Sequence, residues 1–291
     1  MAIGLSGRPR DLLVSGHVNV DRFLAVEEFP APDRTVPVVA QRVELGGTAA
    51  NLARVASRYG VASGLVARIG REFPDEFLDR LRAARIDLRG LERVATSFTP
   101  TCFILEDRRH GQRTLIDQGP MGRVRGARLP GAWLDEYSWL HVTTADPTFQ
   151  LRLVRAARAH GLRVTADPAQ EIHYRWGRRP FLDLLAHSEL LFGNRGEVDR
   201  AVEYAGGSDP SDLLERVPLV VRTEGPRGAT AFSRAGTVHV RAERPKSVRS
   251  AVGAGDAFRG GFYAAWFGGE PLRACLIAGG RASRRWLEGD R

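Results

Sequence analysis

Two kinds of apolar segment alternate along the chain and predict an α/β fold. Short apolar runs typical of buried strands lie at residues 11–15, 61–70, 139–146, 162–168, 190–194 and 218–223. Segments with apolar residues at helical spacing separate them, at residues 47–59, 74–85, 149–161 and 181–188, and the last helix is expected to begin near Gly255. Strands that alternate with helices in this way indicate a parallel sheet covered by helices.

Two stretches depart from the alternation. Residues 34–45 and 99–118 have the pattern of strands with no helix between them, and the second is expected to turn at His110 and Gly111. Such strands do not fit a sheet covered by helices. We therefore predict one domain over residues 1–291 with a small discontinuous β-sheet lid, formed by residues 22–45 and 99–118.

Composition and charge narrow the classes of function. A chain of 291 residues with 43% hydrophobic residues can bury one large core. The net charge of +9 comes from arginines scattered through every segment, with Lys246 the only lysine. This distribution favours attraction of small anions such as ATP over a nucleic-acid surface. No apolar run is long enough for a membrane span, and Cys102 and Cys275 lack metal-site spacing, so a cytoplasmic location is expected.

The most specific chemistry lies at residues 253–261, with the sequence GAGDAFRGG. Gly253 and Gly255 let backbone N–H groups converge at a helix start, where they can bind phosphate oxygens and the charge that develops in phosphoryl transfer. Asp256 follows on the first turn, where a carboxylate would repel a phosphate. It is explained either as the general base for an attacking hydroxyl or as an acidic residue that complements the helix dipole.

Five motifs, in the order in which they follow one another along the chain, resemble those of the ribokinase-like (PfkB) family of carbohydrate and nucleoside kinases. Besides GAGD, residues 16–21 (GHVNVD) match G-x-x-x-x-D and residues 46–51 (GGTAAN) match G-G-x-x-x-N. Residues 194–197 (NRGE) match N-x-x-E, and residues 223–228 (TEGPRG) match T-x-G-x-x-G. The resemblance covers nearly the whole chain and implies a three-layer parallel-sheet sandwich with a β-sheet lid.

The resemblance assigns a role to each matching position. Asp256 would take the proton of the acceptor hydroxyl, while Gly253, Ala254 and Gly255 would form the anion hole. Glu197 would hold Mg²⁺ through water, as suits a cation that loses its hydration shell reluctantly. The acceptor would be bound by Asn19, Asp21, Gly46, Gly47, Asn51, Gln112 and Asp146, and the donor ATP by Asn194, Thr223, Gly225 and Gly228.

Simpler interpretations of the single motifs remain open. Asp21 is also typical of a turn, Asn51 of a helix cap, and the pair Asn194 and Glu197 of a cap with an acidic first turn. The family usually has an acidic residue shortly before GAGD, where this chain has Ser250. This departure argues against activation by a monovalent cation.

The acceptor is predicted from weaker features. Within the family, residues 16–17, 141–147 and 165–170 are most similar to archaeal-type nucleoside kinases, which implies transfer to the 5′-hydroxyl of inosine, guanosine, cytidine or adenosine. Phe103, His110 and Gln112 lie on the predicted lid, where they either meet the base or only pack the lid. The alternatives are a sugar kinase acting on ribose, fructose or 2-keto-3-deoxygluconate, and a binding protein that has kept the fold without the activity.

The predicted partners are therefore small molecules, either a nucleoside or a sugar, with no nucleic acid and no membrane. Exposed strands in a lid have open edges, which pair readily with other strands. The sequence thus also predicts a homodimer formed through the lid.

Overall fold

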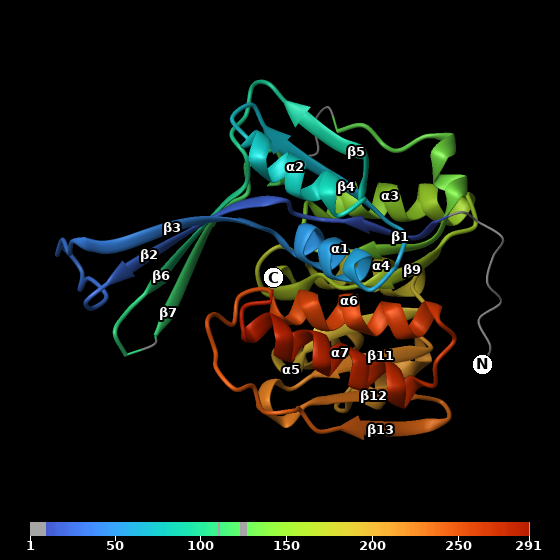
Figure 1. Ribbon diagram of the computed structural model, residues 1–291. Helices are drawn as coiled ribbons and strands as arrows, with labels where there is room; N and C mark the ends of the chain where they lie inside the picture. The colour runs from blue at the N-terminus through green and yellow to red at the C-terminus, as the bar shows by residue number, and fades with distance from the viewer. Residues whose placement is uncertain (1–9, 110, 123–126, 291) are drawn as a thin grey trace.

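The computed structural model describes residues 10–109, 111–122 and 127–290 and confirms the α/β architecture (Figure 1). Nine described strands form one sheet in the order β13-β12-β11-β10-β9-β8-β1-β4-β5. Neighbours from β5 to β11 pair in parallel, whereas β12 and β13 are antiparallel additions at one edge. The strands are β1 (Arg10–Ser15), β4 (Ser63–Gly70), β5 (Asp87–Val94), β8 (Tyr137–Val142), β9 (Arg163–Ala166), β10 (Leu190–Asn194), β11 (Leu219–Thr223), β12 (Ala229–Ser233) and β13 (Gly236–Val240).

Helices cover both faces of this sheet. Alternate residues of β1 point to opposite sides, because a strand has a side-chain period of two. Leu12 and Val14 join a buried cluster with residues of α1, α2, α6 and α7, whereas Leu13 joins a second cluster with residues of α3, α4 and α5. The helices are α1 (Thr48–Arg58), α2 (Asp75–Ala83), α3 (Pro147–Ala159), α4 (Arg178–Ala186), α5 (Arg195–Ala205), α6 (Ala254–Phe267) and α7 (Leu272–Leu287).

The sequence-based expectation missed four elements. Strands β5, β12 and β13 lie toward the edges of the sheet, and β5 and β13 are only partly buried, so they lack the continuous apolar run that marks a central strand. The expectation that the last helix begins near Gly255 was wrong, because α7 follows α6 and packs against it. Adjacent glycines and several arginines hide the helical pattern of α7 in the sequence.

A second, four-stranded sheet projects from the main body (Figure 1). Its order is β3-β2-β6-β7, with β2 (Asn19–Val26), β3 (Val38–Gly46), β6 (Thr101–Glu106) and β7 (Gln112–Asp117). Strands β2 and β3 are antiparallel, as are β6 and β7, and β2 pairs with β6 in parallel. This is the sheet predicted from the two stretches without helices; the expected turn residue His110 lies outside the described residues.

The parallel strands bring distant motifs to one edge. Because β1, β8, β9, β10 and β11 run in the same direction, the residues after their last positions gather at the carboxyl edge of the sheet. Helices α1 and α5 begin within the motifs at residues 46–51 and 194–197, and the second sheet begins at Asn19. None of the described helices is long and apolar enough to span a membrane.

Candidate active site

The glycine pair before α1 is required by close backbone and side-chain approaches. A Cβ at Gly46 would lie 1.9 Å from Asp21 Oδ2, so the Asp21 carboxylate occupies the space that a side chain there would need. Gly47 has a φ of +96°, and a Cβ on it would lie 2.4 Å from the His17 carbonyl oxygen and 2.8 Å from the Asn19 nitrogen. The glycines therefore bring the start of α1 against the β1–β2 connection, next to Asp21 and Asn19.

Asn51 links the GGTAAN motif, which is predicted to bind the acceptor, to the GAGD motif. It is the fourth residue of α1 and only 4% exposed, and its Nδ2 donates to Asp256 Oδ2 at 3.1 Å. The two residues are 205 positions apart in the chain. Asn51 therefore does not cap α1, because the N-cap position is Gly47, and Asp21 lies within β2 rather than in a turn.

Two buried amide oxygens in this region have no hydrogen-bond partner among the described residues. They are Asn19 Oδ1 and Asn51 Oδ1, on side chains that are 5% and 4% exposed. An unsatisfied buried acceptor costs about 1–3 kcal/mol. Donor groups of a bound molecule, such as sugar hydroxyls, would satisfy both oxygens.

Asp256 has the properties of a general base. It lies in the first turn of α6, and burial raises its pKa to about 7 against the opposing effects of the Arg259 charge and the Asn51 hydrogen bond. A carboxylate with a pKa near the working pH is well suited to accept a proton in the transition state. The alternative explanation, an acidic residue that only complements the helix dipole, does not account for its contact with Asn51.

The start of α6 is shaped by Gly253 and by α7. Gly253 is the N-cap residue with a φ of +81°, and a Cβ there would lie 2.8 Å from the Trp286 ring and 2.9 Å from Asn51 Nδ2. Ala254 N–H donates to the Ala251 carbonyl at 3.2 Å. The N–H groups that follow, of Gly255 and Asp256, are those that a first helical turn leaves for a ligand.

Asn194 and Glu197 form a reciprocal helix cap at the start of α5. Glu197 N–H donates to Asn194 Oδ1 at 3.0 Å, and Asn194 N–H donates to Glu197 Oε2 at 2.7 Å. Glu197 is 8% exposed, and burial raises its pKa, while the charge of Arg259 acts in the opposite direction. One carboxylate oxygen thus caps the helix, which leaves the other as the oxygen that could hold a water of Mg²⁺. This donor set fits indirect binding of the ion, and the cap explanation is satisfied at the same time.

The predicted nucleotide-binding residues lie on the turn that follows β11. Thr223 ends β11 and is paired with Asn194 of β10, so the two motifs are neighbours at the carboxyl edge. Gly225 has a φ of +57° and Gly228 a φ of +104°, which disfavour other residue types. A Cβ at Gly228 would lie 1.9 Å from the Val240 carbonyl oxygen.

Two predicted acceptor-binding residues are placed differently. Asp146 is the N-cap of α3, where Oδ1 accepts from Thr148 N and Phe149 N, and Oδ2 lies 3.5 Å from Arg175 Nη2. Gln112 is exposed at the start of β7, where it pairs across the sheet with Glu106 of β6. The line of cross-strand pairs that begins at Asp21 reaches β7 at Ile116, which is four residues from Gln112 and therefore about 13 Å away. Among the described residues, no hydrogen bond or ion pair joins either residue to Asn51 or Asp256.

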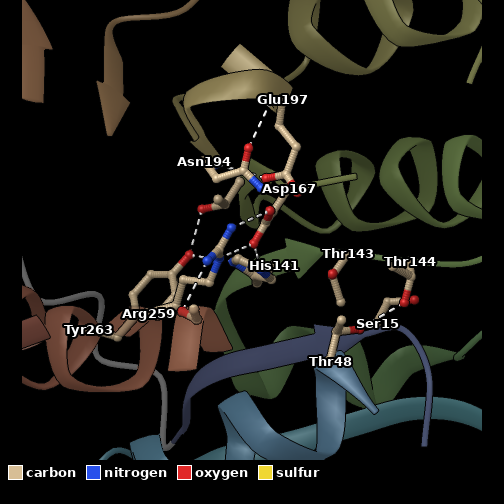
Figure 2. A network of polar contacts seen from close by, with 12 residues as sticks. Ser15, Thr48, His141, Thr143, Thr144, Asp167, Asn194, Glu197, Arg259 and Tyr263 are labelled. Carbon is tan, nitrogen blue, oxygen red and sulfur yellow. Dashed lines mark hydrogen bonds and ion pairs between the residues drawn. The ribbon is translucent and has the colours of Figure 1, made fainter. Parts of the chain in front are cut away.

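A buried polar network beside the anion hole escaped the sequence analysis (Figure 2). Arg259 Nε and Nη2 both donate to the carboxylate of Asp167, and Asp167 Oδ2 lies 3.1 Å from His141 Nε2. The sequence contained a signal for it, because Arg259 is the one charged residue besides Asp256 in an otherwise apolar and glycine-rich helix. Burial lowers the pKa of His141, which keeps its ring neutral beside the Arg259 charge.

Arginines also line the predicted acceptor side. A small pocket is bounded by Asp21 and Asn51, by Arg54 of α1 and Arg80 of α2, and by Trp286 of α7. Trp286 Nε1 donates to the Val252 carbonyl at 2.7 Å, which fixes the ring beside the GAGD segment. Nothing in the sequence connects α2 or α7 with this pocket, because neither helix contains one of the motifs.

Comparison with known proteins agrees with this geometry. The family model described as pfkB family carbohydrate kinase matches residues 9–284. A nucleoside kinase of Methanothermobacter thermautotrophicus is 32% identical over 91% of this chain and 85% of its own length. An ATP-dependent ribose-1-phosphate kinase of Halopiger xanaduensis is 29% identical over 88% of this chain and 84% of its own. The crystal structure of a nucleoside kinase of Methanocaldococcus jannaschii superimposes with a TM-score of 0.89 at 26% identity, covering 98% of this chain and 93% of that one. The chain therefore belongs to the pfkB family of carbohydrate kinases and is a kinase, for which the family implies ATP as phosphoryl donor.

Proposed function

We propose that this kinase transfers the γ-phosphoryl group of ATP to the 5′-hydroxyl of a ribonucleoside such as inosine, guanosine, cytidine or adenosine. The observation that carries the proposal is the contact between Asn51 and Asp256, which joins the predicted sugar-binding residues to the predicted base. The similarity to nucleoside kinases supports the choice of acceptor.

In this proposal the ribose lies between β2 and the start of α1. The Asp21 carboxylate accepts hydrogen bonds from sugar hydroxyls, and the buried oxygens of Asn19 and Asn51 accept others. A site that depends on these bonds rejects analogues lacking the hydroxyls, because buried acceptors would then remain unpaired. The acceptor hydroxyl comes to lie beside Asp256, which Asn51 holds in place.

Asp256 then removes the proton of the attacking hydroxyl as the oxygen attacks the γ-phosphorus and ADP leaves. The N–H groups of Gly255 and Asp256 stabilise the charge on the transferred phosphoryl group. Mg²⁺, held through water by Glu197, would neutralise phosphate charge when bound. Thr223, Gly225 and Gly228 lie where they can line the site of the nucleotide, and the second sheet would close over the acceptor as a lid and exclude water.

An ATP-consumption screen with Mg²⁺ tests the proposal. Nucleosides are compared with ribose, fructose and 2-keto-3-deoxygluconate at equal concentrations, and the product is assigned by ³¹P NMR to the 5′ position or another. Turnover of at least one nucleoside well above all free sugars supports the proposal. Turnover of only a sugar would overturn the acceptor while leaving the role of Asp256 intact.

A second acceptor is favoured by a specific observation. Arg54 and Arg80 line the same pocket as Asp21 and Asn51, and guanidinium groups bind phosphates well. A ribose that carries a phosphate group would therefore also suit the pocket, and one relative is an ATP-dependent ribose-1-phosphate kinase. Ribose 1-phosphate belongs in the same screen. Its turnover above that of every nucleoside would establish this second function instead.

A further inference from the structure

Arg259 is a buried charge that lies one helical turn after Asp256. Both residues are on α6, three positions apart, and residues at this spacing share a face of a helix. The Arg259 side chain is 5% exposed, and burying a charge is costly unless it is paired and hydrogen-bonded. A charge kept at this depth beside a catalytic carboxylate therefore requires an explanation.

The chain holds this guanidinium through several elements. Asp167, after β9, accepts from Arg259 Nε and also from Arg259 Nη2, the latter at 2.8 Å. Asp167 is itself fixed by His141 of β8, whose Nδ1 lies 2.8 Å from the Tyr263 hydroxyl. The Tyr263 hydroxyl donates to Thr165 Oγ1 at 2.7 Å, which ties the network back to β9. The guanidinium is thus anchored to the central strands and not only to its own helix.

The remaining end of the guanidinium reaches the anion hole. Arg259 Nη1 donates to the Gly255 carbonyl oxygen at 2.9 Å. That carbonyl and the N–H of Asp256 belong to one planar peptide group, so fixing one fixes the direction of the other. A Cβ at Gly255 would lie 2.9 Å from Arg259 Nη1, so the glycine leaves the space in which this contact forms.

We propose that Arg259 is a positioning residue for phosphoryl transfer, which fixes the peptide between Gly255 and Asp256 and supplies a positive charge beside the Asp256 carboxylate. The first effect directs the Asp256 N–H at the transferred phosphoryl group. The second effect stabilises the ionised form of the base. This inference rests on the proposed function only for the identity of the acceptor.

The electrostatic surroundings of Asp256 support the second effect. The groups that face it are Asn51 from α1, Arg259 from its own helix, Asp167 after β9 and Glu197 from α5. Arg259 and the Asn51 hydrogen bond favour the carboxylate, whereas Asp167, Glu197 and burial favour the protonated acid. Arg259 is the one positive charge in this set, so its removal leaves the acidic groups without compensation.

Three variants test the proposal. Arg259→Gln removes both the charge and the fork of donors. Arg259→Lys keeps the charge but cannot bridge Asp167 and Gly255 in the same way, because an ammonium group lacks the planar fork. The double variant Asp167→Asn/Arg259→Gln removes both charges of the pair. It is used where the single variant does not fold because Asp167 is left buried and unpaired.

Two measurements are made on each variant. The pKa of Asp256 is measured by ¹³C NMR of labelled aspartate carboxyls without any substrate, and kcat and KM are measured over pH with the acceptor found in the screen. We expect Arg259→Gln and the double variant to lower kcat roughly 10- to 100-fold with little change in the acceptor KM. In Arg259→Gln the Asp256 pKa and the acidic limb of the kcat profile should both move upward, and in the double variant they should move less, because loss of the Asp167 charge acts in the opposite direction. Arg259→Lys should lower kcat while leaving the pKa near that of the wild type.

Arg68→Gln is the matched control. Arg68 is also a buried arginine, 8% exposed, and its Nε donates to Glu92 Oε2 at 2.9 Å between β4 and β5, at one edge of the main sheet. Its loss should lower thermal stability without moving the Asp256 pKa or the pH profile of kcat.

Wild-type kcat in the folded double variant or in Arg259→Lys would show that Arg259 is only structural, and an unmoved Asp256 pKa in folded Arg259→Gln would refute its effect on the base. If the wild type phosphorylates none of the tested acceptors, the proposed function fails, whereas the carboxyl titration still decides the role of Arg259.

Discussion

Replacement of Asp256 by asparagine should affect catalysis and stability in opposite directions, lowering kcat while stabilising the folded protein. Asparagine keeps the shape of the side chain but cannot accept the proton of the attacking hydroxyl. General-base catalysis contributes typically 10²- to 10⁴-fold, so we expect kcat to fall by about that factor. ATP binding should be almost unchanged, because Asp256 contacts the acceptor side through Asn51.

The same substitution should stabilise the protein above neutral pH. Burial raises the pKa of Asp256 to about 7, whereas an aspartate in the unfolded chain titrates near 4. Between these values the folded state binds more protons than the unfolded state, so the free energy of unfolding decreases as the pH rises from about 4 to about 7. The full difference between the folded and unfolded pKa values corresponds to about 4 kcal/mol of unfolding free energy. Solvent screening of this partly exposed side chain reduces that free energy to the order of 2 kcal/mol.

Thermal unfolding at pH 5 and pH 8 measures this effect. At pH 8 the neutral asparagine should raise Tm by roughly 4 °C, whereas at pH 5, where only about a third of the effect has developed, the gain should be roughly 1 °C. Asp199→Asn, at an exposed position of α5, is the control and should change neither kcat nor the pH dependence of Tm. Wild-type turnover by Asp256→Asn would refute the assignment of the base, and an equal Tm difference at both pH values would refute the raised pKa.

Three further predictions follow from the same geometry. Asn51→Ala should raise the acceptor KM at least 10-fold and shift the acidic limb of kcat upward, because the carboxylate loses a hydrogen bond; an unchanged profile would contradict this. Gly253→Ala should cost about 1–2 kcal/mol of unfolding free energy and most of kcat, since its φ is +81° and Trp286 fills the space beside it; calorimetry and kinetics measure both. Light scattering should give a dimeric mass that becomes monomeric in Val39→Lys/Val43→Lys, because these exposed valines lie on the edge strand β3; a monomeric wild type at micromolar concentrations would exclude the predicted dimer.

The sequence by itself determined the central strands of the sheet and indicated the motifs of the candidate site. Buried parallel strands have continuous apolar runs, so β1, β4, β8, β9, β10 and β11 were visible without coordinates. The glycines of the GAGD and GGTAAN segments were informative because positive φ values and close approaches exclude other residues. Strand β5 was hidden because it lacks a continuous apolar run, and α7 because adjacent glycines and several arginines interrupt its apolar face.

Only the tertiary structure decided which residues act together. Asn51 meets Asp256 across 205 positions, and Arg259 meets Asp167 across 92, and neither spacing has a signature in the sequence. The same holds for Trp286 beside Gly253, which depends on how α7 returns along α6. Local chemistry fixes what a helix start can bind, because its N–H groups are set by the backbone. The charge and shape around it are set by side chains from other elements, which only folding brings within contact distance.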